Sequence, residues 1–156
     1  VESTLVHPTY NTRVSFSDDI ALIRLARAVV FSDWVVPICL PTANMNVGSF
    51  LGSSSRSRAS VSGWGTTDAR ESDPSDVLQT VDLPFVDLQT CRTLNRDDGQ
   101  LVPLVPEQLC FGGEAGRDSC TGDSGGPVSA VGSDGRIVLL GLVSYGPTGA
   151  CGVADR

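Results

Sequence analysis

The chain has 156 residues, 40% of them hydrophobic and 19% charged, which suits one globular domain with its own core. Its formal net charge of −7 argues against nucleic acid or an anionic membrane surface as a partner. No apolar stretch approaches the roughly 18 residues that a membrane-spanning helix needs.

The hydrophobic pattern predicts short strands connected by turn-rich loops. Residues 19–25 (DIALIRL) are a continuous apolar run, which fits a strand buried on both faces. Residues 58–64 and 77–86 alternate between apolar and polar side chains, so each is expected to bury one face. The residues expected to share the buried face of the second strand are Val81, Leu83 and Phe85. The strongest strand signal is residues 136–145 (RIVLLGLVSY).

One short helix is expected among these strands. Asp87 can cap a helix that ends at Leu94, with Leu88, Cys91 and Leu94 on one face. The expected loops are the serine-rich residues 42–60, residues 66–76, which should be exposed, and residues 95–106. The sequence has no internal repeat and no βαβ alternation, so these elements indicate an all-β barrel or sandwich.

The five cysteines exclude one kind of site and favour another. They are Cys39, Cys91, Cys110, Cys120 and Cys151, and no two form a C-x-x-C pair. His7 is the only histidine, so a zinc site is not expected. Scattered cysteines in a loop-rich chain favour disulfides and an extracellular protein, although buried, reduced cysteines of a cytosolic protein are the alternative. An odd count leaves at least one cysteine outside any pair within the chain.

The ends of the sequence suggest a piece of a longer protein or a processed chain. The sequence begins at Val1 with neither an initiator methionine nor a signal peptide, and it stops at Arg156 without an obvious cap.

The stretch with the clearest chemical signature is residues 118–128 (DSCTGDSGGPV). Residues 122–126 satisfy G-x-S-x-G, the nucleophile elbow of α/β-hydrolases, in which the serine tops a strand-to-helix turn. The residues that follow, 127–130 (PVSA), fit a strand better than a helix, and βαβ units are missing. The other simple interpretation of Ser124 is an ordinary turn serine in a glycine-rich loop.

Six segments together carry a specific resemblance. They are residues 6–11 (VHPTYN), 18–23 (DDIALI), 37–41 (PICLP), 62–65 (SGWG), 120–128 (CTGDSGGPV) and 142–146 (LVSYG), in this order. The chain thus resembles the chymotrypsin-like (S1 family) serine proteases, of the trypsin-like type, over nearly its whole length. The resemblance implies an all-β, chymotrypsin-like double β-barrel in partial form. Residues 1–156 would be a partial peptidase S1 domain, with the end of the first barrel and most of the second.

The resemblance also implies roles for the residues of the active site. Ser124 would be the nucleophile, and the N–H groups of Gly122 and Ser124 would form the oxyanion hole. Asp19 would be the acid that orients the catalytic histidine, with its neighbour Asp18 more solvated. His7 lies in the surface segment VHPTYN rather than in the segment that carries the family's base. The catalytic histidine is therefore expected upstream of Val1.

Specificity and activation follow from the same resemblance. Asp118 lies six residues before Ser124, the position that forms the floor of the primary pocket in trypsin-like members, so cleavage after Arg or Lys is expected. Asp123 would pair with the new amino terminus after zymogen cleavage. The remaining residues expected to contact substrate are Ser119, Ser144, Tyr145 and Gly146.

The family's disulfides would join Cys91 to Cys110 and Cys120 to Cys151. Cys39 would then be left over, and its counterpart in the family links the catalytic domain to a propeptide or light chain. Digestive trypsins carry one further pair at the positions of Ala59 and Ala130, which are lost together here. The segments GGEAGRDSCTGDSGGP, VSYGPTGACG and VDLPFVDLQTC resemble the arthropod clip-domain proteases.

The expected function is that of a secreted, extracellular trypsin-like serine endopeptidase, made as a zymogen in a proteolytic cascade. Its partners would be protein substrates with Arg or Lys at the cleaved bond and a serpin-type inhibitor, and no cofactor or metal is expected. The alternative is a non-catalytic protease homologue that binds and regulates other proteins. Such homologues usually lack the serine or the histidine, so Ser124 and Asp19 favour the enzyme. We expect this chain alone to be inactive.

Overall fold

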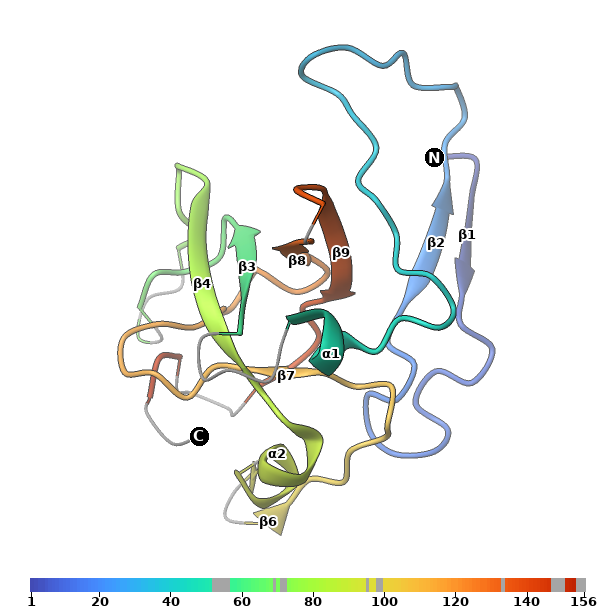
Figure 1. Ribbon diagram of the computed structural model, residues 1–156. Coiled ribbons are helices and arrows are strands. Elements are labelled where there is room, and N and C mark those ends of the chain that lie inside the picture. Colours follow the sequence, from blue (N-terminus) through green and yellow to red (C-terminus); the bar gives the residue numbers. More distant parts are fainter. Residues whose placement is uncertain are drawn as a thin grey trace.

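The computed structural model (Figure 1) describes residues 1–51, 57–68, 70, 73–94, 96–97, 100–132, 134–146 and 151–153. The strands are β1 (Ser3–Val6), β2 (Ala21–Arg24), β3 (Arg58–Gly63), β4 (Gln79–Val86), β5 (Arg96–Asp97), β6 (Gln100–Leu101), β7 (Cys110–Phe111), β8 (Pro127–Val131) and β9 (Ile137–Leu142). The helices are α1 (Val47–Leu51) and α2 (Leu88–Leu94). Neither helix is long enough to cross a membrane, and the described residues contain no other candidate.

The centre of the molecule is a five-stranded antiparallel sheet in the order β7-β4-β3-β8-β9. Its middle strand, β3, pairs Ser60 with Asp82 of β4 on one side and with Ser129 of β8 on the other. A register shift between Val128 and Ser129 bends β8 against β9. Predominantly antiparallel strands and little helix confirm the all-β fold that the sequence predicts.

The core lies on one face of this sheet because alternate side chains of its strands point there. The buried members are Ala59, Val61, Leu83, Val128, Ala130, Val138 and Leu140. Helix α1 packs against this cluster through Val47, Phe50 and Leu51. The predicted alternation of β3 and β4 is confirmed, since Leu83 is only 2% exposed and Val81 and Phe85 are half-buried. Ala59 and Ala130, which replace the pair of cysteines, lie buried in this core.

The first two strands are more exposed than the sequence predicts. Residues 19–25 were expected to form a strand buried on both faces, but β2 is exposed throughout, with Leu22 67% and Ile23 61% exposed. Strand β2 pairs only with β1, so the two form a separate ribbon beside the main sheet (Figure 1). Within the described residues no other strand joins this ribbon, and its apolar side chains therefore stay in contact with solvent.

The predicted helix is present, and two predicted loops contain regular structure. Asp87 caps α2 as expected, since its Oδ1 accepts the Thr90 N–H at 3.0 Å and its Oδ2 accepts the Thr90 hydroxyl at 2.6 Å. The expected loop 42–60 contains α1 and the start of β3, while its residues 52–56 lie outside the described part. The expected loop 95–106 contains the short β5–β6 ladder. In loop 66–76, Thr66 is buried rather than exposed, because its N–H donates to the Thr121 carbonyl at 2.8 Å.

Candidate active site

Ser124 lies on an exposed turn between β7 and β8 whose backbone is held on both sides. The Asp123 N–H donates to the Cys120 carbonyl at 3.0 Å, and the Gly126 N–H donates to the Asp123 carbonyl at 2.8 Å. The Gly125 N–H donates to the Val143 carbonyl at 2.7 Å, which ties the turn to the chain after β9. A fixed turn with an exposed serine is the arrangement that a nucleophile needs, since the substrate must reach its hydroxyl group.

The residues beside the serine adopt backbone angles that favour glycine. Gly122 has a φ of 99° and Gly125 a φ of 80°, both in the left-handed region. A Cβ atom on Gly122 would lie 3.2 Å from the Cα of Gly65, so the two backbones meet closely. Within the described residues, the N–H groups of Gly122 and Ser124 have no hydrogen-bond partner. Two free donors beside an exposed serine can bind an anionic oxygen.

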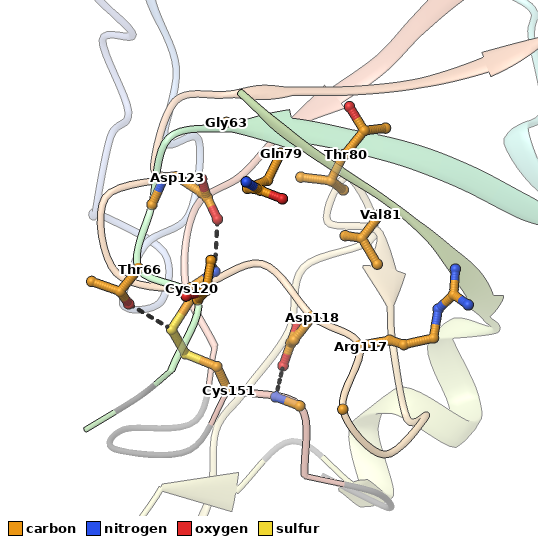
Figure 2. Close-up of a pocket in the computed structure, with 15 residues that line it drawn as sticks. Gly63, Thr66, Gln79, Thr80, Val81, Arg117, Asp118, Cys120, Asp123 and Cys151 are labelled. Atoms are coloured by element: carbon orange, nitrogen blue, oxygen red, sulfur yellow. Dashed lines mark hydrogen bonds between the residues drawn. A yellow bond between two sulfur atoms is a disulfide. The ribbon is translucent and has the colours of Figure 1, made fainter. Parts of the chain in front are cut away.

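Asp123 fixes the serine turn to the end of β3. Its Oδ2 accepts the Cys120 N–H at 2.9 Å (Figure 2). Its Oδ1 accepts the Gly65 N–H at 2.8 Å. A Cβ atom on Gly65 would lie 2.6 Å from the Asp123 carboxyl carbon, so glycine is required at this approach. In this structure two backbone donors satisfy the carboxylate, and its pairing with a new amino terminus stays a prediction.

Asp118 lies in a cavity of about 250 Å³ that it shares with Asp123 (Figure 2). Its two carboxylate oxygens accept the Ser119 N–H at 2.9 Å and the Gly152 N–H at 3.1 Å. Burial raises the pKa of Asp118 above its usual range, and the two N–H donors oppose part of that rise. The site therefore holds a desolvated carboxylate, to which a cation can bind more strongly than to a carboxylate in water.

Two disulfides hold the loops around this cavity, and they are the pairs that the resemblance implies. Cys120–Cys151 joins the serine turn to the chain beyond β9, and Cys91–Cys110 joins α2 to β7. The Gly116 N–H donates to the Gly152 carbonyl at 2.7 Å and so reinforces the first link. Cys39 is free and half-buried within the described residues. No three His, Cys, Asp or Glu side chains of the described residues gather as a metal site would require.

Asp19 and Ser144 meet although 125 positions separate them, because Ser144 Oγ donates to Asp19 Oδ2 at 2.6 Å. This bond links the end of the β1–β2 connection to the chain after β9. Of the other expected substrate contacts, Ser119 and Tyr145 are half-buried and Gly146 is exposed. A hydroxyl donor on the Asp19 carboxylate restricts its orientation, which suits an acid that must hold a histidine in place.

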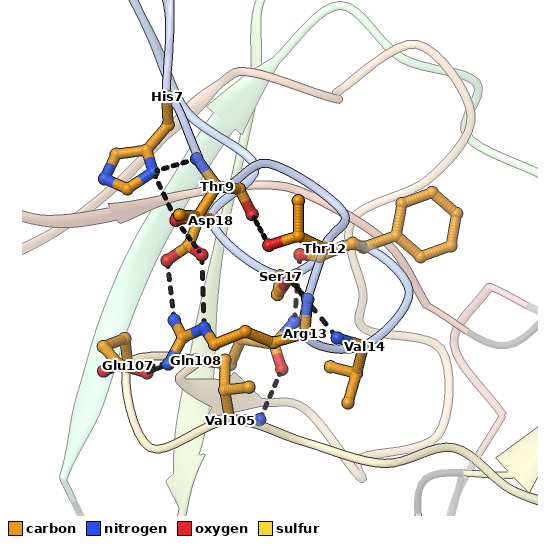
Figure 3. Close-up of polar contacts among 11 residues, drawn as sticks. His7, Thr9, Thr12, Arg13, Val14, Ser17, Asp18, Val105, Glu107 and Gln108 are labelled. Atoms are coloured by element: carbon orange, nitrogen blue, oxygen red, sulfur yellow. Dashed lines mark hydrogen bonds and ion pairs between the residues drawn. The ribbon is translucent and has the colours of Figure 1, made fainter.

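Asp18 differs from the expectation that it is more solvated. It is half-buried, its carboxylate pairs with Arg13 at 2.7 Å, and it accepts the Thr9 hydroxyl at 2.8 Å (Figure 3). Hydrogen bonds from Arg13 and then from Thr9 lower the pKa of Asp18. His7 lies in the same group, with Nδ1 3.1 Å from Thr9 Oγ1. The exposed His7 is thus occupied within its own loop, as a surface histidine is expected to be.

Sequence reasoning missed the residues that surround Asp18. Arg13 pairs with both Asp18 and Glu107, and the Gln108 side chain donates to the Phe16 carbonyl at 3.2 Å. These residues stand in loops without periodicity, and no motif marks them, so only the folded chain brings them together.

The comparisons with known proteins agree with this geometry. Residues 1–156 match the sequence model of the trypsin family. The chain is 40% identical over 152 residues to serine protease 7 of Drosophila melanogaster and 37% identical over 161 residues to the phenoloxidase-activating enzyme of Bombyx mori. It is 38% identical over 151 residues to CLIP domain-containing serine protease B15 of Anopheles gambiae.

These alignments cover 94%, 99% and 94% of this chain but only 36%, 35% and 38% of the relatives. The chain therefore spans between a third and two fifths of the length of these three relatives. The expected resemblance to arthropod clip-domain proteases is confirmed, and so is the partial chymotrypsin-like β-barrel. The chain belongs to the trypsin family of serine proteases.

Proposed function

We propose that the protein is a serine endopeptidase that cleaves peptide bonds after Arg or Lys through an acyl-enzyme on Ser124. The observation that carries this proposal is the exposed turn of Ser124, beside which the N–H groups of Gly122 and Ser124 have no hydrogen-bond partner among the described residues. Residues 1–156 would be one part of a peptidase S1 domain.

In the proposed reaction, Ser124 Oγ attacks the carbonyl carbon of the scissile bond while its proton passes to a histidine. The N–H groups of Gly122 and Ser124 donate to the oxygen that becomes negative, and one such donor stabilises the transition state by roughly 3–4 kcal/mol. The histidine then protonates the leaving amine, and water hydrolyses the acyl-enzyme by the same steps. The histidine would come from a segment that precedes Val1 in the whole protein.

Asp19 would orient that histidine and stabilise its protonated form. The Ser144 hydroxyl bond at 2.6 Å supports this role because it leaves the second carboxylate oxygen of Asp19 available to the imidazole. Ser144, Tyr145 and Gly146 would lie along the bound peptide.

Asp118 would select Arg or Lys at the cleaved bond. At an effective dielectric constant of about 20, two unit charges 4 Å apart attract by roughly 4 kcal/mol before desolvation is counted. Arg can add two parallel hydrogen bonds to a carboxylate, so Arg should be preferred over Lys. Ser119 offers a hydroxyl beside Asp118 for a lysine ammonium.

A positional-scanning peptide library tests the specificity in the activated, full-length protease that contains this chain. Wild type should cleave after Arg and Lys, and Asp118→Ser should lose most of this activity. A preference for Phe, Leu or Ala in wild type, or unchanged cleavage after Arg by Asp118→Ser, would show that Asp118 is not the selecting residue.

We further propose that the protein is secreted as a zymogen and acts in an extracellular proteolytic cascade. The two disulfides support an oxidising compartment, and some relatives carry names such as phenoloxidase-activating enzyme. After cleavage, Asp123 would exchange its backbone donors for the new amino terminus. A serpin-type inhibitor would be a partner of the active enzyme.

Cys39 would form a disulfide with a propeptide or light chain. Non-reducing peptide mapping of the full-length protein should recover Cys39 joined to a peptide from outside residues 1–156. Recovery of Cys39 bonded to Cys91 or Cys110 would contradict both this partner and the pairing of the other cysteines.

The second candidate function is a non-catalytic homologue that binds and regulates other proteins. The identity of the residue at the histidine position of the full-length protein separates the two functions, because a homologue without this base cannot activate Ser124.

A further inference from the structure

The loop that precedes Asp19 is held in an unfavourable backbone conformation. Asn11, Phe16 and Asp18 have φ angles of 57°, 60° and 55°, in the left-handed region. Asn and Asp tolerate this region better than other residues, whereas a bulky Phe rarely adopts it. Such conformations are unfavourable and persist only where the surrounding contacts impose them.

Local contacts account for part of this conformation. The Asn11 side chain accepts the Phe16 N–H at 2.9 Å, and the Asn11 N–H donates to the Ser17 carbonyl at 2.8 Å. Ser17 is fully buried, and its Oγ accepts the Arg13 N–H at 3.3 Å. These bonds close the loop on itself, but they do not fix it relative to the main sheet.

Arg13 supplies that fixation because its guanidinium bridges two carboxylates from distant parts of the chain (Figure 3). It contacts both oxygens of Asp18, with Nη2 2.7 Å from Oδ1 and Nε 3.3 Å from Oδ2. Its Nη1 lies 3.2 Å from Oε2 of Glu107, 94 positions further along the chain. Arg13 thus joins the strained loop to the segment before β7.

Two further contacts join the same loop to other parts of the chain. Gln108, next to Glu107, donates from Nε2 to the Phe16 carbonyl at 3.2 Å, and its Oε1 accepts the Val105 N–H at 3.0 Å. The rings of Phe16 and Tyr145 stack with centroids 4.9 Å apart. Tyr145 directly follows Ser144, the donor to Asp19.

We propose that Arg13 is a positioning residue for Asp19. Its ion pairs with Asp18 and Glu107 hold the strained loop against the segment before β7, and the carboxylate of Asp19, the next residue in the chain, keeps its orientation as a result. This inference rests on the proposed function in one respect, namely that Asp19 orients the catalytic histidine.

The pair of Arg13 with Glu107 should affect geometry more than stability. Both side chains are exposed, that of Arg13 by 42% and that of Glu107 by 61%, and exposed ion pairs contribute little to folding. The side chain of Asp18 is only 11% exposed, so its pair with Arg13 also contributes to the stability of the loop. A displacement of about 1 Å in a catalytic group, by contrast, can lower the rate by as much as roughly 100-fold.

The test uses the activated, full-length protease, with rates expressed per active site that an irreversible serine reagent titrates. Arg13→Met removes both ion pairs, and Glu107→Gln weakens only the distant one. The matched control is Arg24→Met, which removes an exposed ion pair to Glu2 on the ribbon. Arg13→Met should lower kcat roughly tenfold while KM changes by less than about twofold. Glu107→Gln should lower kcat by a smaller factor, Arg13→Lys should recover part of the loss, and Arg24→Met should match wild type.

A second measurement does not depend on activity. Hydrogen exchange of the Asn11 and Ile20 amides, which donate to Ser17 and Asp18, should be faster in Arg13→Met while exchange in β3 is unchanged. A kcat per titrated site equal to that of Arg24→Met would overturn the proposal, and so would unchanged exchange. If activated wild type hydrolyses no substrate, the proposed function fails, and hydrogen exchange then decides whether Arg13 holds the loop.

Discussion

Ser144 Oγ donates to Asp19 Oδ2 across 2.6 Å, and this bond joins the end of the β1–β2 connection to the chain beyond the main sheet. A hydrogen bond to a charged group contributes about 1.5–3 kcal/mol. In the proposed mechanism this bond helps to hold the Asp19 carboxylate toward the histidine, so its loss should lower the reaction rate.

Ser144→Ala should therefore lower kcat of the activated protease about threefold to thirtyfold, because Asp19 loses one of the groups that orient it. Steady-state kinetics on an arginyl ester measure the change. The matched control is Ser49→Ala, an exposed serine on α1, which should leave kcat unchanged. Equal kcat values for the two variants would show that the Ser144 bond does not orient Asp19.

Gly122 should not tolerate a side chain. Alanine at this position meets two penalties, a φ of 99° and a contact of 3.2 Å with the Gly65 backbone. Gly113 has a φ of 88° with nothing within 4 Å of a Cβ, so Gly113→Ala meets only the backbone penalty of roughly 1–2 kcal/mol. Chemical denaturation should show that Gly122→Ala destabilises the protein more than Gly113→Ala does. A smaller loss for Gly122→Ala would mean that the two backbones do not meet as described.

The pH dependence of stability should carry a contribution from Asp118. Burial raises its pKa in the folded protein above the ordinary 3.8, so folding favours the protonated form. Its contribution to stability is fully present below the unfolded pKa and is lost as pH rises through the folded pKa. The free energy of unfolding of wild type minus that of Asp118→Asn should therefore become more positive as pH falls through this window. Thermal denaturation of both proteins from pH 7 to pH 3 measures this difference, and a change of the opposite sign contradicts the assignment.

The two disulfides should differ in their effect on substrate binding. In the chain-entropy model, loops of 31 and 19 residues make each bond worth about 3–4 kcal/mol. Replacing Cys120 and Cys151 by serine should also raise KM for Arg substrates, because Gly152, which donates to Asp118, loses its anchor. Replacing Cys91 and Cys110 is the control, and it should lower the melting temperature without raising KM. An increase in KM on replacing Cys91 and Cys110, with no increase on replacing Cys120 and Cys151, would contradict this prediction.

Local sequence pattern predicted what depends on local chemistry. The period-two alternation of β3 and β4 placed Leu83 on the buried face, and the carboxylate of Asp87 marked the start of α2. The prediction that β2 is a buried strand was wrong. A continuous apolar run shows only that a strand can be covered on both faces, and among the described residues β1 alone pairs with β2.

The contact of Arg13 with Glu107 could not be predicted, because it joins loops that are 94 positions apart and leaves no periodic signal. The motif identified Ser124, Asp123 and Asp118 as neighbours in one loop. The bonds of Asp123 to Gly65 and of Asp118 to Gly152 depend on how the main sheet brings separate turns together.

Covalent labelling tests most directly whether Ser124 is the nucleophile. The activated, full-length protease is treated with a fluorophosphonate probe, and the labelled peptide is identified by mass spectrometry in wild type and in Ser124→Ala. We predict that wild type carries one probe on Ser124 and that Ser124→Ala carries none. Absence of label in wild type whose activation cleavage has been verified, or undiminished labelling of Ser124→Ala, would contradict the assignment of Ser124 as the nucleophile.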